Sequence, residues 1–205
     1  MDKKTNLFIE VAMKTMAAIT ITYFAVRIFQ SYQFRPNNVL LLLLLGEIIT
    51  ISLVIVAKPT DTRDFSITPV LLTVAGTFCI ILVSLDTGIQ LVPRIVSQTI
   101  MVIGICWQIL SKIYLGRSFG LLPAHRSVVD TGPYRLIRHP IYFGYFINHV
   151  GFLLNQFSLY NLMILTIVYL FQFGRMYYEE KTLSRSEEYR QYKERVKKRF
   201  IPFVI

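Results

Sequence analysis

The sequence has few residues of the kinds that hold metal ions or form disulfides. It contains two cysteines and three histidines among 205 residues. Cys79 and Cys106 both fall inside apolar runs, without C-x-x-C spacing and without a neighbouring histidine. This pattern favours small packing residues over metal ligands. We therefore expect no metal site.

The motifs by which soluble enzymes bind nucleotides are also missing. The sequence has no Gly-rich phosphate loop, no Walker motif and no Rossmann fingerprint, and it shows no internal repeat. These absences argue against the common soluble nucleotide folds. We expect one domain over residues 1–205.

Charge is scarce over long stretches of the chain, and apolar residues dominate. Hydrophobic residues make up 54% of the sequence and the mean hydropathy is +0.50, which is typical of an integral membrane protein. Most of the apolar segments approach the ~20 residues that span a bilayer. They cover approximately residues 7–29, 39–57, 67–85, 91–115, 142–154 and 159–177.

These segments predict an all-α, polytopic transmembrane helical bundle with about five to six membrane segments. The segment 142–154 is short for a span at about 1.5 Å per residue, so we expect Asn155 and Gln156 to turn a tilted or partly re-entrant hairpin. Lys3 and Lys4 precede the first segment, but a small-residue cleavage site is lacking. We interpret that segment as a retained helix.

Basic residues in the short loops indicate an orientation. In a six-span arrangement, most of them share one side and Arg35 falls on the other. The residues on the shared side are Lys3, Lys4, Lys58, Arg63, Arg117, Arg126, Arg135 and Arg138. The positive-inside rule therefore places both termini and the loop 116–141 in the cytoplasm.

The net charge of +10 is better explained by membrane anchoring than by nucleic-acid binding, because the basic residues border the spans or crowd residues 181–199. We expect this tail to form an interfacial helix. Each charge near an anionic lipid surface contributes about 1 kcal/mol of attraction. Whether the helix also forms the wall of a site stays open.

The long polar interruption of the chain is the loop 116–141. Its end, residues 132–142 (GPYRLIRHPIY), gathers two prolines, two tyrosines, two arginines and a histidine between apolar segments. Polar groups kept near hydrocarbon cost free energy, so such a cluster is a candidate functional site. A plain connector at a membrane edge has a similar composition.

A second polar cluster stands at the end of the last apolar segment. Arg175 and Glu179 are four residues apart and share one helical face. They form either a structural salt bridge or a pair that binds a ligand with one anionic and one cationic group. If this segment folds back beside the loop, they face residues 138–142. We expect Glu180 to point elsewhere, toward solvent or the next turn.

Four motifs follow one another in the second half of the chain. They are GPY at 132–134, RHPxYxG at 138–144, RxxxEExxL at 175–183, and EYxxYxxxV at 188–196 followed by IP at 201–202. In this order and spacing, the chain resembles the isoprenylcysteine carboxyl methyltransferase family and its phospholipid methyltransferase relatives. These are small integral membrane enzymes that use S-adenosylmethionine. Before Gly116 the likeness is one of hydropathy alone.

The resemblance implies that residues 1–115 are N-terminal transmembrane helices and that residues 116–205 bind the cofactor and carry catalysis. It implies that Arg175 and Glu179 are catalytic, with Arg175 on the substrate side and Glu179 near the charged amino acid end of the donor. The implied cofactor-binding residues are Arg126, Val128, Val129, Tyr134, Arg138, His139, Pro140, Tyr142 and Glu179. Isoprenylcysteine enzymes typically have His-x-Leu-Val in this region, whereas here Arg126 takes the place of that histidine.

These observations predict methyl transfer from S-adenosylmethionine to a lipophilic acceptor in the membrane, most like isoprenylcysteine carboxyl O-methylation. A carboxylate acceptor is already ionised, and Arg175 would bind it with two hydrogen bonds. An amine or phenol acceptor would need a base, for which His139, Tyr142 and Glu179 are candidates. The alternatives are methylation of a phospholipid or another small lipophilic amine or thiol, and a non-catalytic membrane scaffold.

Other polar residues lie within the apolar segments. Glu47 needs a partner or a cavity in the membrane, and we expect a structural role for it. Candidate partners are Lys14, Arg27 and Arg94. Asn148 and His149 either form hydrogen bonds between helices or line a substrate tunnel.

Overall fold

The computed structural model describes residues 3–34, 38–57, 66–84, 88–120 and 127–201. Within these residues the chain forms seven α-helices and no β-strand, which confirms the all-α prediction. The helices are α1 (Lys3–Phe34), α2 (Asn38–Val56), α3 (Ile67–Phe78), α4 (Arg94–Leu115), α5 (Pro140–Asn155), α6 (Leu159–Leu183) and α7 (Glu187–Arg195).

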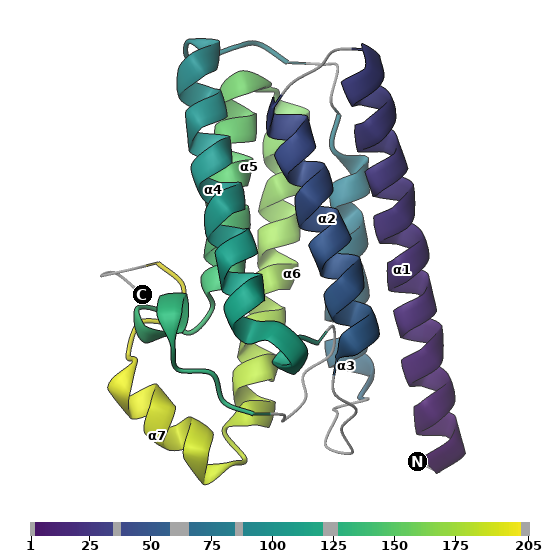
Figure 1. Ribbon diagram of the computed structural model, residues 1–205, viewed down its shortest axis with the longest axis vertical. Helices are drawn as coiled ribbons and strands as arrows, with labels where there is room; N and C mark the ends of the chain where they lie inside the picture. Colours follow the sequence, from purple (N-terminus) through teal and green to yellow (C-terminus); the bar gives the residue numbers. More distant parts are fainter. Residues whose placement is uncertain (1–2, 35–37, 58–65, 85–87, 121–126, 202–205) are drawn as a thin grey trace.

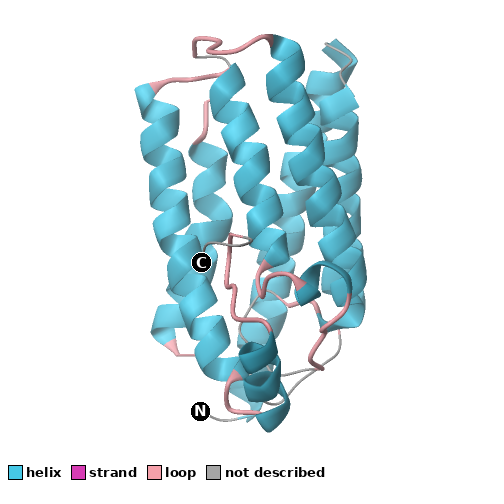
Figure 2. Cartoon of the chain, turned by 90° about the vertical axis from the view of Figure 1, so that its left-hand side faces the viewer, coloured by secondary structure: helices cyan, strands magenta, loops and turns pink. Residues whose placement is uncertain are grey.

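Helices α1 to α6 run side by side as an upright bundle, and α7 lies at one end of it, beside the end of α6 (Figure 1; Figure 2 shows the bundle from the side). Helix α4 packs on α5 and on α2, α1 packs on α2, and α3 packs on α6. We call the end that carries α7 the α7 end. The connections before α4 and before α6 lie at the opposite end.

Three helices of the described chain are long and apolar enough to cross a membrane. The candidate spans are Val39–Val56, Arg94–Ser118 and Leu159–Leu183, and shorter apolar helices cover Ala18–Gln30 and Ile67–Leu82. Large apolar side chains such as Ile55, Ile95 and Leu170 are exposed on the outside of the bundle. An outer surface of this kind is stable in lipid, so the chain is a membrane protein. The number of spans stays a prediction.

A seam of glycines brings α4 and α5 close together. A Cβ atom on Gly104 would lie 2.5 Å from the backbone nitrogen of Asn148, and one on Gly144 would lie 2.8 Å from the backbone nitrogen of Gln108. Such contacts are too short for any larger residue, and small residues commonly allow membrane helices to approach in this way. The seam fixes how Gln108 and Asn148 are presented to the interior.

The end of the bundle opposite α7 is tied by hydrogen bonds. Ile89 and Phe157 exchange two backbone hydrogen bonds of 2.8 and 2.9 Å. The side chain of Asn161 donates to the carbonyl oxygens of Ser84 and Gln156 at 3.0 and 3.1 Å. Helix α5 ends at Asn155 and α6 begins at Leu159, so the hairpin turn predicted at residues 155 and 156 is confirmed.

Helix α7 begins where its sequence favours a helix start. The side chain of Ser186 accepts a hydrogen bond from the backbone of Tyr189, and two glutamates occupy the first turn. Tyr189 and Tyr192 are buried against Val196, with Val128 and Leu183 packed beside them. The C-terminal helix is therefore not only an interfacial element. It packs on the loop that precedes α5.

Candidate active site

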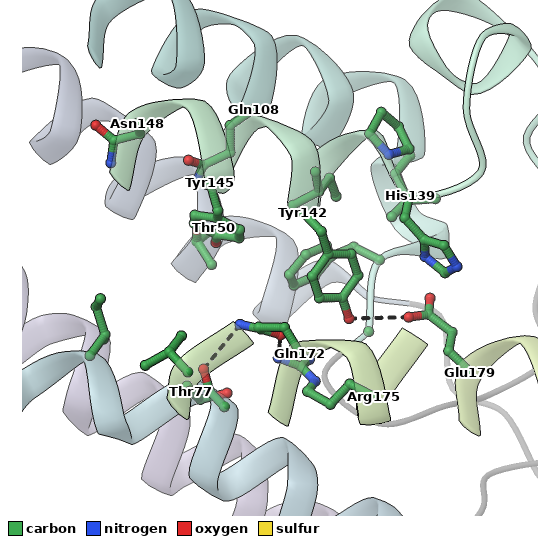
Figure 3. A pocket seen from close by; sticks show the side chains of 18 of the residues that line it. Thr50, Thr77, Gln108, His139, Tyr142, Tyr145, Asn148, Gln172, Arg175 and Glu179 are labelled. Carbon is green, nitrogen blue, oxygen red and sulfur yellow. Dashed lines mark hydrogen bonds between the residues drawn. The ribbon is translucent and has the colours of Figure 1, made fainter. Parts of the chain in front are cut away.

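A cavity of about 360 Å³ lies inside the bundle, with α4 and α5 on one side and α6 and α3 on the other (Figure 3). At the α7 end its wall includes the loop before α5 and the two tyrosines of α7. Toward the opposite end the wall becomes apolar, with Met101, Phe152, Leu165 and Val168. Its volume falls within the range of small-molecule sites.

Two polar residues of α6 meet α5 across this cavity. The hydroxyl of Tyr142 donates to Glu179 Oε2 at 3.2 Å, and the guanidinium of Arg175 lies 5.6 Å from the centre of the Tyr142 ring. Arg175 Nη1 donates to Gln172 Oε1 at 3.3 Å, and Gln172 Nε2 donates to the Gly76 carbonyl at 3.0 Å. Figure 3 shows these side chains converging between the helices. The last apolar segment folds back beside the loop, as the sequence suggested.

The sequence-predicted site residues that the structure describes all line this one cavity. They are Val128, Val129, Tyr134, Arg138, His139, Pro140, Tyr142, Arg175 and Glu179. Arg126 lies outside the described residues. Residues from the loop, from α5 and from α6 thus share one space, although contact with a cofactor stays a prediction.

Glu180 points away from the cavity that Arg175 and Glu179 line, as expected, but the expectation that it faces solvent or the next turn was wrong. The residue is 3% exposed, and its Oε1 lies 3.2 Å from His139 Nε2 and 3.2 Å from Arg138 Nε. The contact with Arg138 Nε is an ion pair without hydrogen-bond geometry. Its Oε2 lies 3.0 Å from Arg199 Nη2 and 3.7 Å from Lys193 Nζ. The reason is that α7 and the tail fold over the side of α6 that the sequence suggested would face solvent.

The tail after α7 pairs with the loop. The backbone nitrogens of Arg138 and His139 donate to the carbonyls of Lys198 and Arg199, each at 3.0 Å. The next residue, Phe200, is 2% exposed. Its ring contacts four others from α5 and α6, with centroids 5.4 to 6.5 Å apart. They are Phe143, Phe146, Tyr169 and Phe173.

Helix α7 holds the loop at a second point. The hydroxyl of Tyr192 donates to the carbonyl of Tyr134 at 2.7 Å, and Arg195 forms an ion pair of 2.9 Å with Asp130. Burial raises the pKa of Tyr134, Tyr189 and Tyr192 above the ordinary tyrosine value. These hydroxyls therefore stay protonated at neutral pH, and the bond from Tyr192 persists.

The middle of the cavity is lined by amides from three helices. Gln108, Asn148 and Gln172 are all buried there, and the Oδ1 of Asn148 has no hydrogen-bond partner among the described residues. His149 Nδ1 lies 2.9 Å from the Tyr169 hydroxyl, so a hydrogen bond between helices is confirmed for His149. A buried amide without a partner is uncommon in proteins and marks a place where a ligand or water can bind.

A buried lysine stands behind this part of the wall. Lys112 is fully buried, donates to Thr50 Oγ1 at 2.7 Å, and lies 5.2 Å from the Tyr145 ring centre. Glu47, one turn before Thr50 on α2, is close enough to Lys112 for electrostatic attraction between the two side chains. Lys112 is not among the partners expected for Glu47, because it comes from the last turn of α4 and the packing of α2 on α4 has no signal in the sequence.

Comparison with known protein families identifies a match over the second half of the chain. Residues 88–191, which are 104 of the 205, match the phospholipid methyltransferase family. The chain belongs to the phospholipid methyltransferase family. This family is part of a group of integral membrane methyltransferases related to the isoprenylcysteine enzymes, so the predicted relationship is confirmed. No curated protein matches the chain significantly.

The phospholipid methyltransferase match covers the elements that carry the site. It includes α4, the loop, α5, α6 and the first part of α7, whereas α1 to α3 and the tail after Gln191 lie outside it. Members of this family are methyltransferases that act on lipophilic membrane substrates.

Proposed function

We propose that the protein transfers a methyl group from S-adenosylmethionine to a lipophilic acceptor that enters from the bilayer. The observation that carries this proposal is the convergence of Tyr142, Arg175 and Glu179 on one cavity built from family-matched elements. The scaffold alternative gives no account of a cavity lined at one end by charges and at the other by hydrocarbon.

The residues at the α7 end suit the chemical groups of this donor. The donor carries a sulfonium and an ammonium cation, a carboxylate and an adenosine. Glu179 supplies an acidic group, Arg138 a basic one, and Tyr134 and Tyr142 supply rings against which a flat base or a cation packs. When bound, S-adenosylmethionine would supply an electrophilic methyl group. We assign the predicted cofactor-binding residues, His139 and Pro140 among them, to its site.

For this reaction the protein has to align the donor with the acceptor and exclude water from the space between them. The bond from Tyr142 to Glu179 and the bond from Arg175 to Gln172 hold these side chains in fixed positions around the cavity. Arg175 would orient an anionic oxygen of the acceptor, because its fork of donors matches such a group. An ionised carboxylate needs no base. For an amine or a phenol, Glu179, Tyr142 and His139 are the candidate bases.

Two acceptor classes remain. The motif resemblance favours an isoprenylcysteine-type carboxylate, whereas the family match favours a phospholipid amine. The amide-lined middle of the cavity supports the second class, because Gln108 and Asn148 suit the polar atoms of a head group better than a prenyl chain. The apolar end, with Leu165 and Val168, would take hydrocarbon in either case.

Donor binding is the first test. Calorimetry of the detergent-purified protein should show saturable binding of S-adenosylmethionine and S-adenosylhomocysteine, and Glu179→Gln should weaken it by about tenfold, the loss of one charge-assisted contact. Glu188→Gln, an exposed acid on α7, is the matched control and should bind like the wild type. No binding by folded wild type, repeated in lipid nanodiscs, would refute the proposal.

The acceptor is tested by turnover. Nanodiscs containing the protein and labelled donor are supplied with either dioleoyl phosphatidylethanolamine or N-acetyl-S-farnesylcysteine, and label is measured in the extracted lipid. We expect more label on the phospholipid. Arg175→Lys should lower kcat/KM by roughly 10- to 100-fold, because lysine cannot reproduce two parallel hydrogen bonds. More label on the farnesyl compound would instead indicate that the acceptor is an isoprenylcysteine-type carboxylate.

A further inference from the structure

We infer that Glu180 and the C-terminal segment, defined as residues 196–200, position the loop that holds the methyl donor. This inference rests on the proposed function. Glu180 and the C-terminal segment belong to the described chain and do not line the cavity. They can therefore act on the donor only through other residues, and among the residues they contact are Arg138 and His139, which do line the cavity.

The first link is a backbone pairing. Arg138 and His139 donate their backbone N–H groups to the carbonyls of Lys198 and Arg199, both at 3.0 Å. These two loop residues precede α5 and have no helical partners for their N–H groups. The C-terminal segment thus fixes the path of the loop at the residue before Pro140, where α5 begins.

The second link is electrostatic. The buried carboxylate of Glu180 lies within 3.2 Å of Arg138 Nε and His139 Nε2, and within 3.0 Å of Arg199 Nη2. One acid from α6 therefore joins the loop to the C-terminal segment. Because opposite charges with little access to water attract strongly, the carboxylate orients Arg138, and its hydrogen bond with His139 orients that ring.

The third link anchors the segment itself. Phe200 is buried among rings of α5 and α6, and edge-to-face contacts of this kind stabilise a packed position. A shift of His139 would also reach the cavity. The centres of the His139 and Tyr142 rings are 5.6 Å apart, and the Tyr142 hydroxyl donates a hydrogen bond to Glu179. The family match ends at Gln191, before the segment begins.

The test compares variants of the full-length protein in detergent. Phe200→Ala removes the anchor, Phe200→Leu keeps most of its bulk, and Lys197→Ala changes an exposed side chain of the same segment. Hydrogen exchange followed by mass spectrometry should show faster exchange over residues 127–142 in Phe200→Ala alone. S-adenosylhomocysteine affinity should fall by roughly 10- to 100-fold in Phe200→Ala, with Phe200→Leu and Lys197→Ala close to wild type.

Each outcome decides a different claim. If wild type binds the ligand and Phe200→Ala binds it equally well, the inference is wrong. If wild type does not bind, the proposed function fails, while the exchange of residues 127–142 still decides whether the segment orders the loop. If Phe200→Ala does not fold, Arg199→Ala takes its place. It should weaken binding in the same way, and Arg199→Lys should partly restore it. Binding by Arg199→Ala equal to wild type would overturn the inference.

Discussion

Two neighbouring glutamates on α6 have opposite surroundings. Successive residues of a helix point about 100° apart, so Glu179 faces the cavity and Tyr142, whereas Glu180 is enclosed by basic groups of the loop, α7 and the tail. The same carboxylate group thus lines the cavity at one position and joins the loop, α7 and the tail at the next.

Substitution should separate these two contributions. Glu180→Gln leaves Arg138 without a buried counter-charge, so the free energy of unfolding should fall by about 2–4 kcal/mol, allowing for the partial exposure of Arg199. Glu179→Gln should cost less than about 1 kcal/mol while weakening donor binding. Thermal denaturation in detergent measures the first quantity. Equal loss of stability in both variants would contradict this division.

Site residues that belong to local sequence motifs could be predicted. Residues whose role depends on contacts between distant segments of the chain could not. The GPY and RHPxY motifs and the i,i+4 spacing of Arg175 and Glu179 identified side chains that do share one cavity. The role of Glu180 depends on a tail that returns across α6, and no local pattern encodes that return. The position of Gln108 in the cavity wall was also not predictable, because it depends on the close packing of α4 and α5 at the glycine seam.

At the scale of elements, the contact between α7 and the loop depends on buried tyrosines. Burial raises the pKa of Tyr134, Tyr189 and Tyr192. The folded protein keeps these groups protonated at a pH where the unfolded chain releases its protons. Their contribution is therefore fully present below the unfolded pKa of about 10 and is lost as the pH rises through the folded values.

A steep loss of stability in alkali should follow. The melting temperature should fall between pH 9 and pH 11, and the fall should be smaller in Tyr192→Phe, which has one such hydroxyl fewer. At pH 8 this variant should be less stable by about 1 kcal/mol, because the carbonyl of Tyr134 loses its donor. Identical pH profiles for variant and wild type would show that Tyr192 does not contribute.

The glycine seam gives a second test at this scale. Gly144→Ala places a Cβ 2.8 Å from the backbone of Gln108, so α4 and α5 must separate, whereas Gly46→Ala meets only Ile109 at an ordinary 3.9 Å. We expect the first variant to lower the melting temperature and to reduce donor binding, and the second to do neither. If Gly144→Ala had the same melting temperature and donor affinity as Gly46→Ala, close packing at Gly144 would not be required.

Helix positions follow from hydropathy more readily than helix partners do. The observed helices overlap all six predicted apolar segments, because the cost of exposing backbone in lipid forces such segments into helices. The pairing of α3 with α6 could not be predicted, since one apolar face resembles another. It depends on contacts such as Gln172 with Gly76.

At the scale of the whole molecule, the predicted orientation can be tested by labelling. With Cys79 and Cys106 replaced by alanine, single cysteines at the exposed positions Arg185 and Gln90 mark the two ends, since they lie beyond opposite ends of α6. A membrane-impermeant maleimide added to intact cells should label Gln90→Cys and spare Arg185→Cys until the cells are opened. The reverse result would place the termini outside, against the positive-inside rule.

The cavity wall is shared between two portions of the chain. The loop, α5 and α6 lie within the family match, whereas Leu43, Glu47 and Gly76, from α2 and α3, line the same cavity from outside it. The matched portion therefore does not enclose the cavity by itself. For an engineer, exchanging α2 and α3 between relatives would change this part of the cavity wall while leaving the loop, α5 and α6 as they are.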